Sequence, residues 1–258
     1  MDEKFGLISI IMAAYNSEKT IEQAISSVIA QTYPQFELLV IDDCSTDNTA
    51  ALIERLAQRD SRIRLIRNEK NSGVSYTRKR GLKEACGEWI AILDSDDAWR
   101  PNKLEKQIAL QQEKNADLLY TGSAFMGSNG NAIDYILHAP AEIDYRRLLK
   151  QNLISNSSVL VRKTLYVKYY AVGDNMHEDF AMWLQMLKAG NVAYGVDEPL
   201  LVYRLAKSSK SGNKFQAAKM NWNTYRHVGL NVISAAFYEC CYAVKGVLKY
   251  KNLKHSTF

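Results

Sequence analysis

The feature that most constrains the fold is a regular alternation of short apolar runs and helical patterns in the first hundred residues. Residues 7–13 (LISIIMA) and 36–41 (FELLVI) are almost entirely apolar, as strands buried on both faces require. From Ile21 to Ile29, apolar residues recur at the i, i+3, i+4 spacing of an amphipathic helix. Further strands are predicted at 63–66 and 89–93. This order predicts an α/β fold with an open, mostly parallel sheet flanked by helices and joined by right-handed crossovers.

After Pro101 the pattern becomes less regular. A helix is predicted from about Asn102 to Lys114, followed by an extended stretch over 117–126. Two short strands are expected near 192–196 and 200–203. No internal repeat and no long linker interrupts the chain, so we expect both halves to contribute strands to one sheet.

The length of 258 residues, with 47% apolar residues, is enough for one large domain or two fused half-domains. We divide the chain into a domain over 1–205, with halves at 1–98 and 99–205, and a C-terminal helical tail over 206–258.

The four cysteines form no CxxC pair, which disfavours a structural zinc site or a disulfide framework. Acidic residues at positions 2 and 3 are not typical of a signal peptide, so we expect a protein that is not exported.

Charge is distributed unevenly along the chain. Residues 204–258 hold ten Lys or Arg residues and one acid, Glu239, giving +9, whereas the other residues sum to −4. Such a basic segment indicates an anionic partner, and nucleic acid is disfavoured because no nucleic-acid-binding motif accompanies the charge. The region 223–249 is predicted to be one helix, too polar for a comfortable membrane span. Its apolar stripe comprises Leu230, Ile233, Phe237, Cys241, Val244 and Leu248.

Two interpretations of this stripe remain open from the sequence. The helix lies at an anionic membrane surface, which suits its apolar face and basic flanks. Alternatively, it packs on the domain or on a second subunit, in which case the protein is a homodimer.

Polar residues follow three of the first four predicted strands. The segments at these strand ends are Ala14-Tyr15-Asn16, Asp42-Asp43-Cys44-Ser45-Thr46-Asp47 and Asp94-Ser95-Asp96-Asp97. In open parallel sheets ligands bind at the carboxyl ends of the strands, where these side chains gather. Neighbouring carboxylates repel one another unless a cation or a donor lies between them, and Mg²⁺ or Mn²⁺ on a diphosphate meets that need.

Each of these signals also has a purely structural interpretation. Asp43 or Ser45 is a candidate cap for the following helix, and Ser17 is a candidate cap for the helix after the first strand. Asp-Ser-Asp-Asp is commonly a solvated turn. The order and spacing of the motifs together make the functional interpretation the stronger one.

Four motifs carry a resemblance to a known family. They are MAAYN, LLVIDDCSTDNT, NSGVSYTRKRGLKEACGEWIAILDSDDAW and HEDFAMWLQMLKAG. Together they resemble the family 2 glycosyltransferases, inverting enzymes with the GT-A fold, over roughly Leu7 to Arg204. The similarity is greatest to the bacterial subgroup that builds O-antigen, capsule or teichuronic-acid repeat units. The resemblance therefore implies a hexosyltransferase that uses a nucleotide-diphosphate sugar.

The resemblance implies roles for five residues at the nucleotide. Tyr15 matches the aromatic residue that packs on uracil, and Asp43 matches the acid that accepts the uracil N3–H. Asp42 is a second nucleoside contact or structural. Arg78 resembles the basic residue near the nucleotide, and Asp94, the first acid of the DxD motif, faces the ribose or the sugar.

Further roles follow for the metal and the acceptor. Asp96 would hold a divalent metal, Mn²⁺ or Mg²⁺, on the diphosphate, with Asp97 positioning the loop. Asp179 matches the general base that deprotonates the acceptor hydroxyl. Contacts to the acceptor or the diphosphate are expected from Glu178, Trp183 and Arg204, although Trp183 is equally expected in the core.

The sequence departs from the family after Tyr203-Arg204, where many members carry a His a few residues later. The absence of that His puts a third protein ligand for the metal in doubt. Three lysines nearby are alternative contacts to the diphosphate: Lys207, Lys210 and Lys214.

The expected activity is transfer of a hexose from a UDP-sugar, with UDP-glucose as the favoured donor. The expected acceptor is an N-acetylhexosamine on diphospho-undecaprenol, at the cytoplasmic face of the bacterial inner membrane, with the protein bound peripherally. Three alternatives compete with this interpretation: a nucleotidyltransferase, a receiver-type signalling domain and an inactive nucleotide-binding scaffold. The first lacks a glycine-rich phosphate loop after strand one, and the second is about half this length.

Overall fold

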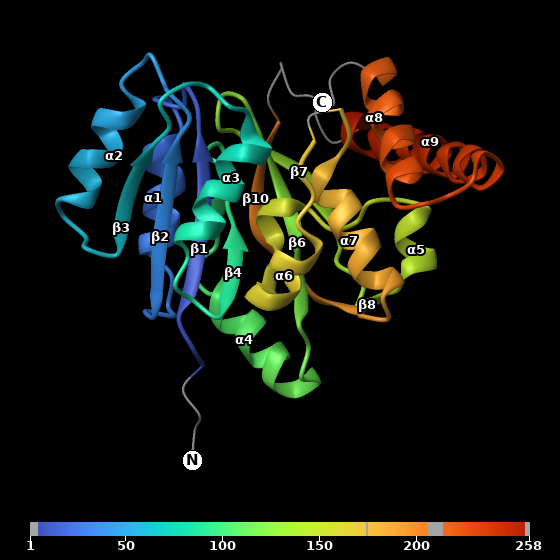
Figure 1. The fold of residues 1–258 in the computed structure, drawn as a ribbon, viewed down its shortest axis with the longest axis horizontal. Helices are drawn as coiled ribbons and strands as arrows, with labels where there is room; N and C mark the ends of the chain where they lie inside the picture. Colours follow the sequence, from blue (N-terminus) through green and yellow to red (C-terminus); the bar gives the residue numbers. More distant parts are fainter. Residues whose placement is uncertain (1–4, 174, 206–213, 256–258) are drawn as a thin grey trace.

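A computed structural model describes residues 5–173, 175–205 and 214–255 (Figure 1). The described strands form one ten-stranded sheet, with the main order β3-β2-β1-β4-β9-β6-β10-β5. The strands are β1 (Ile8–Ala14), β2 (Phe36–Asp42), β3 (Ile63–Arg67), β4 (Trp89–Ile92), β5 (Ala98–Trp99), β6 (Leu118–Gly127), β7 (Ala132–Leu137), β8 (Glu142–Ile143), β9 (Leu160–Arg162) and β10 (Ala193–Leu205). The α/β fold and the shared sheet expected from the sequence are both confirmed.

Helices cover both faces of this sheet (Figure 1). They are α1 (Ile21–Ile29), α2 (Thr49–Ala57), α3 (Val74–Glu84), α4 (Lys103–Lys114), α5 (Tyr145–Leu149), α6 (Lys163–Tyr169), α7 (Glu178–Lys188), α8 (Lys214–His227) and α9 (Val232–His255), with a 3-10 helix η1 (Asn156–Ser158). Because side chains alternate across a strand, Ile10 of β1 packs in the cluster that includes α1, whereas Ile11 packs in the cluster that includes α3 and α7.

The first half is a regular parallel sheet. β1 pairs in parallel with β2 and with β4, and β2 pairs with β3, with no irregularity in register. α3 lies close to this sheet at Gly81, where an added Cβ would approach the side chains of Ile41 and Ile11 to 2.6 and 2.7 Å. This regularity brings the carboxyl ends of β1, β2 and β4 to one edge.

The second half is a mixed sheet. β9 is antiparallel to both β4 and β6, while β10 runs parallel to β6. The two short strands expected near 192–196 and 200–203 form a single strand, β10, with register shifts around Pro199. Proline has no N–H to donate to a neighbouring strand, so the irregularity falls where the sequence pattern appeared to break.

The tail forms two helices, so the prediction of one helix over 223–249 is wrong. α8 ends at His227, and Gly229 adopts a φ of +85°, which allows the chain to turn before α9. Figure 1 shows α8 and α9 beside α7, at the end of the molecule opposite α2 and β3. In the part of the chain that the structure describes, no helix combines the length and apolar character needed to cross a membrane.

Candidate active site

The loops after β1 and β4 are joined at the carboxyl edge of the sheet. The Ser17 and Ser95 hydroxyl oxygens lie 2.8 Å apart, and the backbone N–H of Ser17 donates to Thr49 Oγ1. The expectation that Ser17 caps the first helix is wrong, because α1 begins at Ile21 with Thr20 at its N-cap position and no side-chain cap. Ser17 instead ties the first loop to the acidic motif.

Asp43 lies at the end of β2 and is buried. Its Oδ1 accepts hydrogen bonds from Asn68 Nδ2 at 2.7 Å and from the Ser72 N–H at 2.9 Å, and its Oδ2 accepts from the Gly73 N–H at 2.9 Å. It is therefore not a cap of α2, whose first turn is instead contacted by the side chain of Asp47. Asp43 holds the segment that leads into α3 against the end of β2.

Asp42, the last residue of β2, is also buried. Its carboxylate accepts weak hydrogen bonds from the Ser45 N–H at 3.3 and 3.4 Å and lies 3.9 Å from Arg67 Nε. Tyr15 differs from both acids, because its side chain is 49% exposed at the end of β1. The edge of the sheet thus presents an exposed ring beside a loop held by buried carboxylates.

The acidic motif after β4 is held by residues far away in sequence. The Asp94 N–H donates to Ser157 Oγ at 3.1 Å, and the Arg204 N–H donates to Asp97 Oδ1 at 2.9 Å. Arg204 Nε also donates to the backbone oxygen of Asp96 at 2.9 Å. Arg204 therefore belongs to the site as an anchor of the acidic loop.

The carboxylates of this motif are crowded. Burial, and then the charge of Asp94, raise the pKa of Asp96 to about 6. Burial, and then the charges of Asp94 and Asp96, raise the pKa of Asp97 well above its usual range. Raised pKa values from desolvation and like charges are typical of functional sites, and a cation beside the loop would relieve the repulsion.

Arg78 joins the two halves of the domain. Its guanidinium is buried, with Nη2 2.5 Å from Asp94 Oδ1 and Nη1 2.9 Å from Glu178 Oε1. Burial alone would lower the pKa of Arg78, but the charges of Asp94 and then Glu178 raise it on balance. The guanidinium fork thus links the DxD motif to the Glu-Asp pair at the start of α7.

Tyr203 of β10 lies within the electrostatic influence of four carboxylates. Burial first, and then the charges of Asp97, Asp94, Asp96 and Asp179, raise the pKa of its hydroxyl group. The acid at the start of α7 therefore shares an electrostatic environment with the acidic motif of β4. This cluster of charge, with the Arg78 bridge, defines the candidate active site.

The carboxylates of this site limit how a divalent metal could be held. Among the described residues, no group of three or more His, Cys, Asp or Glu side chains has an arrangement that could hold a metal ion. Asp94 already forms an ion pair with Arg78, whereas the side chain of Asp96 is half-buried and its pKa is raised. One carboxylate plus phosphate oxygens fits the coordination that Mg²⁺ and Mn²⁺ take on nucleotides.

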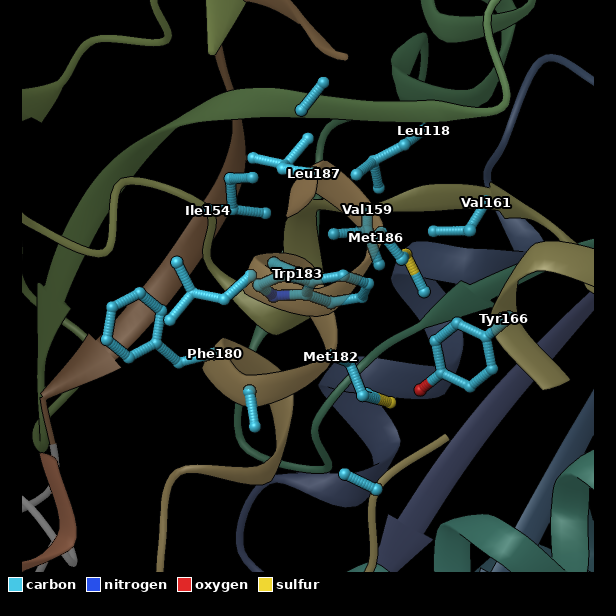
Figure 2. Close-up of a cluster of buried hydrophobic side chains, with 14 of the residues drawn as sticks. Leu118, Ile154, Val159, Val161, Tyr166, Phe180, Met182, Trp183, Met186 and Leu187 are labelled. Carbon is cyan, nitrogen blue, oxygen red and sulfur yellow. The ribbon is translucent and has the colours of Figure 1, made fainter. Parts of the chain in front are cut away.

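Trp183 lies in the core, not at the acidic edge of the sheet. It is fully buried on α7 among Met182, Met186 and Tyr166 (Figure 2). Of the two interpretations that the sequence left open, core packing is the one that the structure shows. Among the lysines expected near the diphosphate, Lys207 and Lys210 lie outside the described residues, as does the side chain of Lys214.

The sequence does not mark two residues of the site, Ser157 and Tyr203, as functional. Ser157 lies in η1, where Trp99 Nε1 donates a hydrogen bond to its backbone oxygen at 2.7 Å. This contact holds the Ser157 hydroxyl group where it accepts a hydrogen bond from the Asp94 N–H. The sequence pattern marks Tyr203 only as the end of a strand. Nothing in the local pattern around Ser157 marks it, because its role comes from a contact across 63 residues of chain.

These features define the class of protein. An open α/β sheet with acids and an exposed aromatic residue at its carboxyl edge is the arrangement of a nucleotide-sugar-binding domain.

Two solved structures share the fold of this chain. Staphylococcus aureus TarS 1–349, in complex with UDP-GlcNAc, matches with a TM-score of 0.70 at 22% identity, over 90% of this chain and 70% of that chain. The mannosyltransferase PcManGT from Pyrobaculum calidifontis, a structure with GDP-Man and Mn²⁺, matches with a TM-score of 0.70 at 15% identity, over 93% and 69%.

The sequence comparisons establish the family. Residues 9–172 match the model of glycosyl transferase family 2. The chain is 39% identical over 253 residues to the UDP-Glc:alpha-D-GlcNAc-diphosphoundecaprenol beta-1,3-glucosyltransferase WfgD of Escherichia coli, covering 96% of this chain and 98% of that protein. The chain belongs to glycosyltransferase family 2, as the motifs predicted, and is a hexosyltransferase of that family. The nucleotidyltransferase and receiver alternatives are thereby excluded.

Proposed function

We propose that the chain transfers glucose from UDP-glucose to an N-acetylhexosamine on diphospho-undecaprenol, with inversion, in the synthesis of a bacterial surface polysaccharide. The observation that carries this proposal is the buried Arg78 guanidinium, which pairs with Asp94 of the acidic motif and with Glu178 at the start of α7. The printed activity of WfgD supports the choice of donor and acceptor. The TarS complex with UDP-GlcNAc supports a UDP-sugar in this fold.

The first half of the domain would bind the donor. Tyr15 offers an exposed ring on which uracil can stack, and Asp43 and Asp42 hold the surrounding loops. Asp94 faces the ribose or the sugar with the oxygen that Arg78 does not occupy. In this arrangement Arg78 acts on the nucleotide through Asp94, because its Nη atoms are already engaged by two carboxylates.

The second half would bind the acceptor. Asp179 is half-buried at the start of α7 and acts as the general base that removes the proton from the attacking hydroxyl group. Glu178, on the same turn, accepts from Arg78, and this contact fixes the start of α7 relative to the donor. Attack from the face opposite UDP converts an α-linked donor into a β-linked product.

Asp96 would hold Mn²⁺ or Mg²⁺ on the diphosphate. When bound, the metal neutralises negative charge on the departing UDP. Arg204 keeps Asp96 and Asp97 in place through two of its groups, the backbone N–H and Nε, while its Nη2 donates to Gln23 Oε1. The lipid-linked acceptor places the protein at the cytoplasmic face of the inner membrane, to which the basic tail would bind it peripherally.

A donor screen tests this proposal. Purified protein is given UDP-glucose, UDP-galactose, UDP-GlcNAc or GDP-mannose, with Mn²⁺ and a synthetic GlcNAc-diphospho-lipid acceptor. We expect UDP-glucose to give the highest turnover and the product to carry a β-linkage by nuclear magnetic resonance. An α-linked product would refute single displacement, and absence of transfer with every donor would favour an inactive scaffold.

A further inference from the structure

One face of α9 is apolar and exposed to solvent. Ile233, Phe237 and Val244 are 82%, 58% and 63% exposed, and Cys240 between them is exposed as well. Their spacing of four, three and four residues places all four side chains on one side of the helix. We call these four residues the outer stripe.

The opposite face of α9 packs on the domain. Tyr238 lies 6.3 Å from the ring of Tyr225 on α8, and Tyr242 lies 6.0 Å from Phe180 on α7, measured between ring centroids. Ala235 is fully buried in the same core. The exposure of the outer stripe therefore does not reflect a helix detached from the domain, because α9 is anchored by its other face.

The charge of this region favours one kind of partner. Lys219 and Arg226 on α8 are exposed, and the sequence continues beyond the outer stripe with Lys249, Lys251 and Lys254. Glu239 is the one acid among residues 204–258, and its Oε2 is buried, away from solvent. An apolar face within a basic segment is complementary to a membrane with anionic headgroups.

A second copy of the chain is the weaker candidate for this face. A twofold contact through α9 would place the same patch of both copies together. Each copy would bring a segment of charge +9 to that contact, and like charges across an interface disfavour association.

We infer that the outer stripe of α9 inserts into the anionic surface of a lipid bilayer and thereby docks the catalytic domain on the membrane that carries its acceptor. This inference rests on the proposed function for the nature of the acceptor, and it specifies which side chains enter the lipid. The basic residues attract the surface, and the apolar side chains hold the protein at the boundary between headgroups and acyl chains.

Vesicle flotation tests the inference. The full-length protein is mixed with vesicles of phosphatidylethanolamine and phosphatidylglycerol, or of phosphatidylcholine alone, at 0.05 to 0.5 M salt. The test variant is Ile233→Ser/Phe237→Ser. The matched control is Leu7→Ser/Val167→Ser, which removes two exposed apolar side chains, one just before β1 and one on α6.

We expect the affinity of the test variant for anionic vesicles to fall by a factor of about ten or more, because two inserting apolar side chains are lost. The control should bind anionic vesicles like the parent protein. The parent, the control and the test variant should all bind vesicles of phosphatidylcholine alone much more weakly than the parent binds anionic vesicles. Equal binding by test variant and parent would overturn the inference. A parent dimer that the test variant converts to monomer in sedimentation would also overturn it, because the stripe would then be a subunit contact.

A second measurement does not depend on loss of binding. Tryptophan at position 237 (Phe237→Trp) should be quenched by brominated acyl chains in anionic vesicles, whereas Val167→Trp should not. Unquenched emission from position 237 on bound protein would exclude insertion. Transfer to a short, water-soluble GlcNAc-diphosphate acceptor should be equal in Ile233→Ser/Phe237→Ser and the parent. Loss of that transfer in the parent itself would count against the proposed function, not against docking.

Discussion

The two halves of the sheet place their functional side chains in different ways. In the first half, four parallel strands in regular register bring Tyr15, Asp43 and Asp94 to one edge, each within two residues of the end of a strand. In the second half the strands are mixed and irregular, and the site residues come from a 3-10 helix, a helix start and the end of β10. The regular half can be inferred from local pattern, whereas the irregular half depends on contacts that no local pattern encodes.

The sharpest way to test the first half is to remove its proposed metal ligand. Asp96→Ala should abolish transfer and should weaken UDP binding only when Mn²⁺ or Mg²⁺ is present, because the lost carboxylate acts through the metal. Calorimetric titration of UDP with and without EDTA measures this. Asp134→Ala, an exposed acid on β7, is the control and should be neutral. Full activity in EDTA would contradict the role of Asp96.

The second half is tested at its proposed base. Asp179→Asn should keep donor binding while turnover falls by roughly two to four orders of magnitude, the usual effect of losing a general base. Steady-state kinetics measures the turnover, and a separate titration with UDP measures donor binding. The control is Asp144→Asn at the start of α5, where the side chain accepts from the Arg147 N–H. Turnover near that of the parent would leave Asp179 a purely structural acid at a helix start.

The connection between the halves is tested at Arg78. Arg78→Met should lower the free energy of unfolding by about 3–5 kcal/mol, because it leaves Asp94 and Glu178 without their buried partner. Arg78→Lys should recover part of the stability but little turnover, since an ammonium group cannot bridge two carboxylates as a fork does.

Chemical denaturation gives the stability of the Arg78 variants, and the exposed pair Arg55–Glu22 provides the comparison. Arg55→Met should cost about 1 kcal/mol or less, as for surface ion pairs. An equal cost for the two arginines would mean that the bridge does not couple the halves.

The smallest expected effect concerns pH and the metal-free protein. The folded-state pKa of Asp96 is about 6 against an ordinary value of 3.8, so the folded protein retains a proton that the unfolded chain releases. Stability of the metal-free protein should therefore fall as pH rises through this interval. Asp96→Asn should raise the melting temperature at pH 8 by about 2–4 °C, for a gain on the order of 1 kcal/mol after allowance for partial exposure.

The gain in Asp96→Asn should shrink as pH falls towards 4, because the parent carboxyl group is then largely protonated in the folded state and partly protonated in the unfolded chain. Thermal melting across pH 4 to 8 checks the slope. A gain that is independent of pH would show that the charge of Asp96 is not the cause.

Much of the fold was predictable because burial dictates residue type. The continuous apolar runs of β1, β2 and β4 identify strands buried on both faces, and the periodicity from Ile21 to Ile29 identifies the helix between two of them. The position of the acids at strand ends follows from the parallel order of these strands. The predictions were less accurate where backbone geometry departs from a regular period, at Pro199 in β10 and at Gly229 between α8 and α9.

The sequence by itself determined the family, the open parallel sheet and the gathering of Asp94, Asp96 and Asp97 at its edge, because these follow from short-range periodicity and from four motifs in order. Only the tertiary structure decided the partners of those acids. Arg78 meets Glu178 across 100 residues of chain, and Ser157 meets Asp94 across 63. Such pairings depend on how helices and strands pack in space, and packing is a property of the whole chain that no local pattern records.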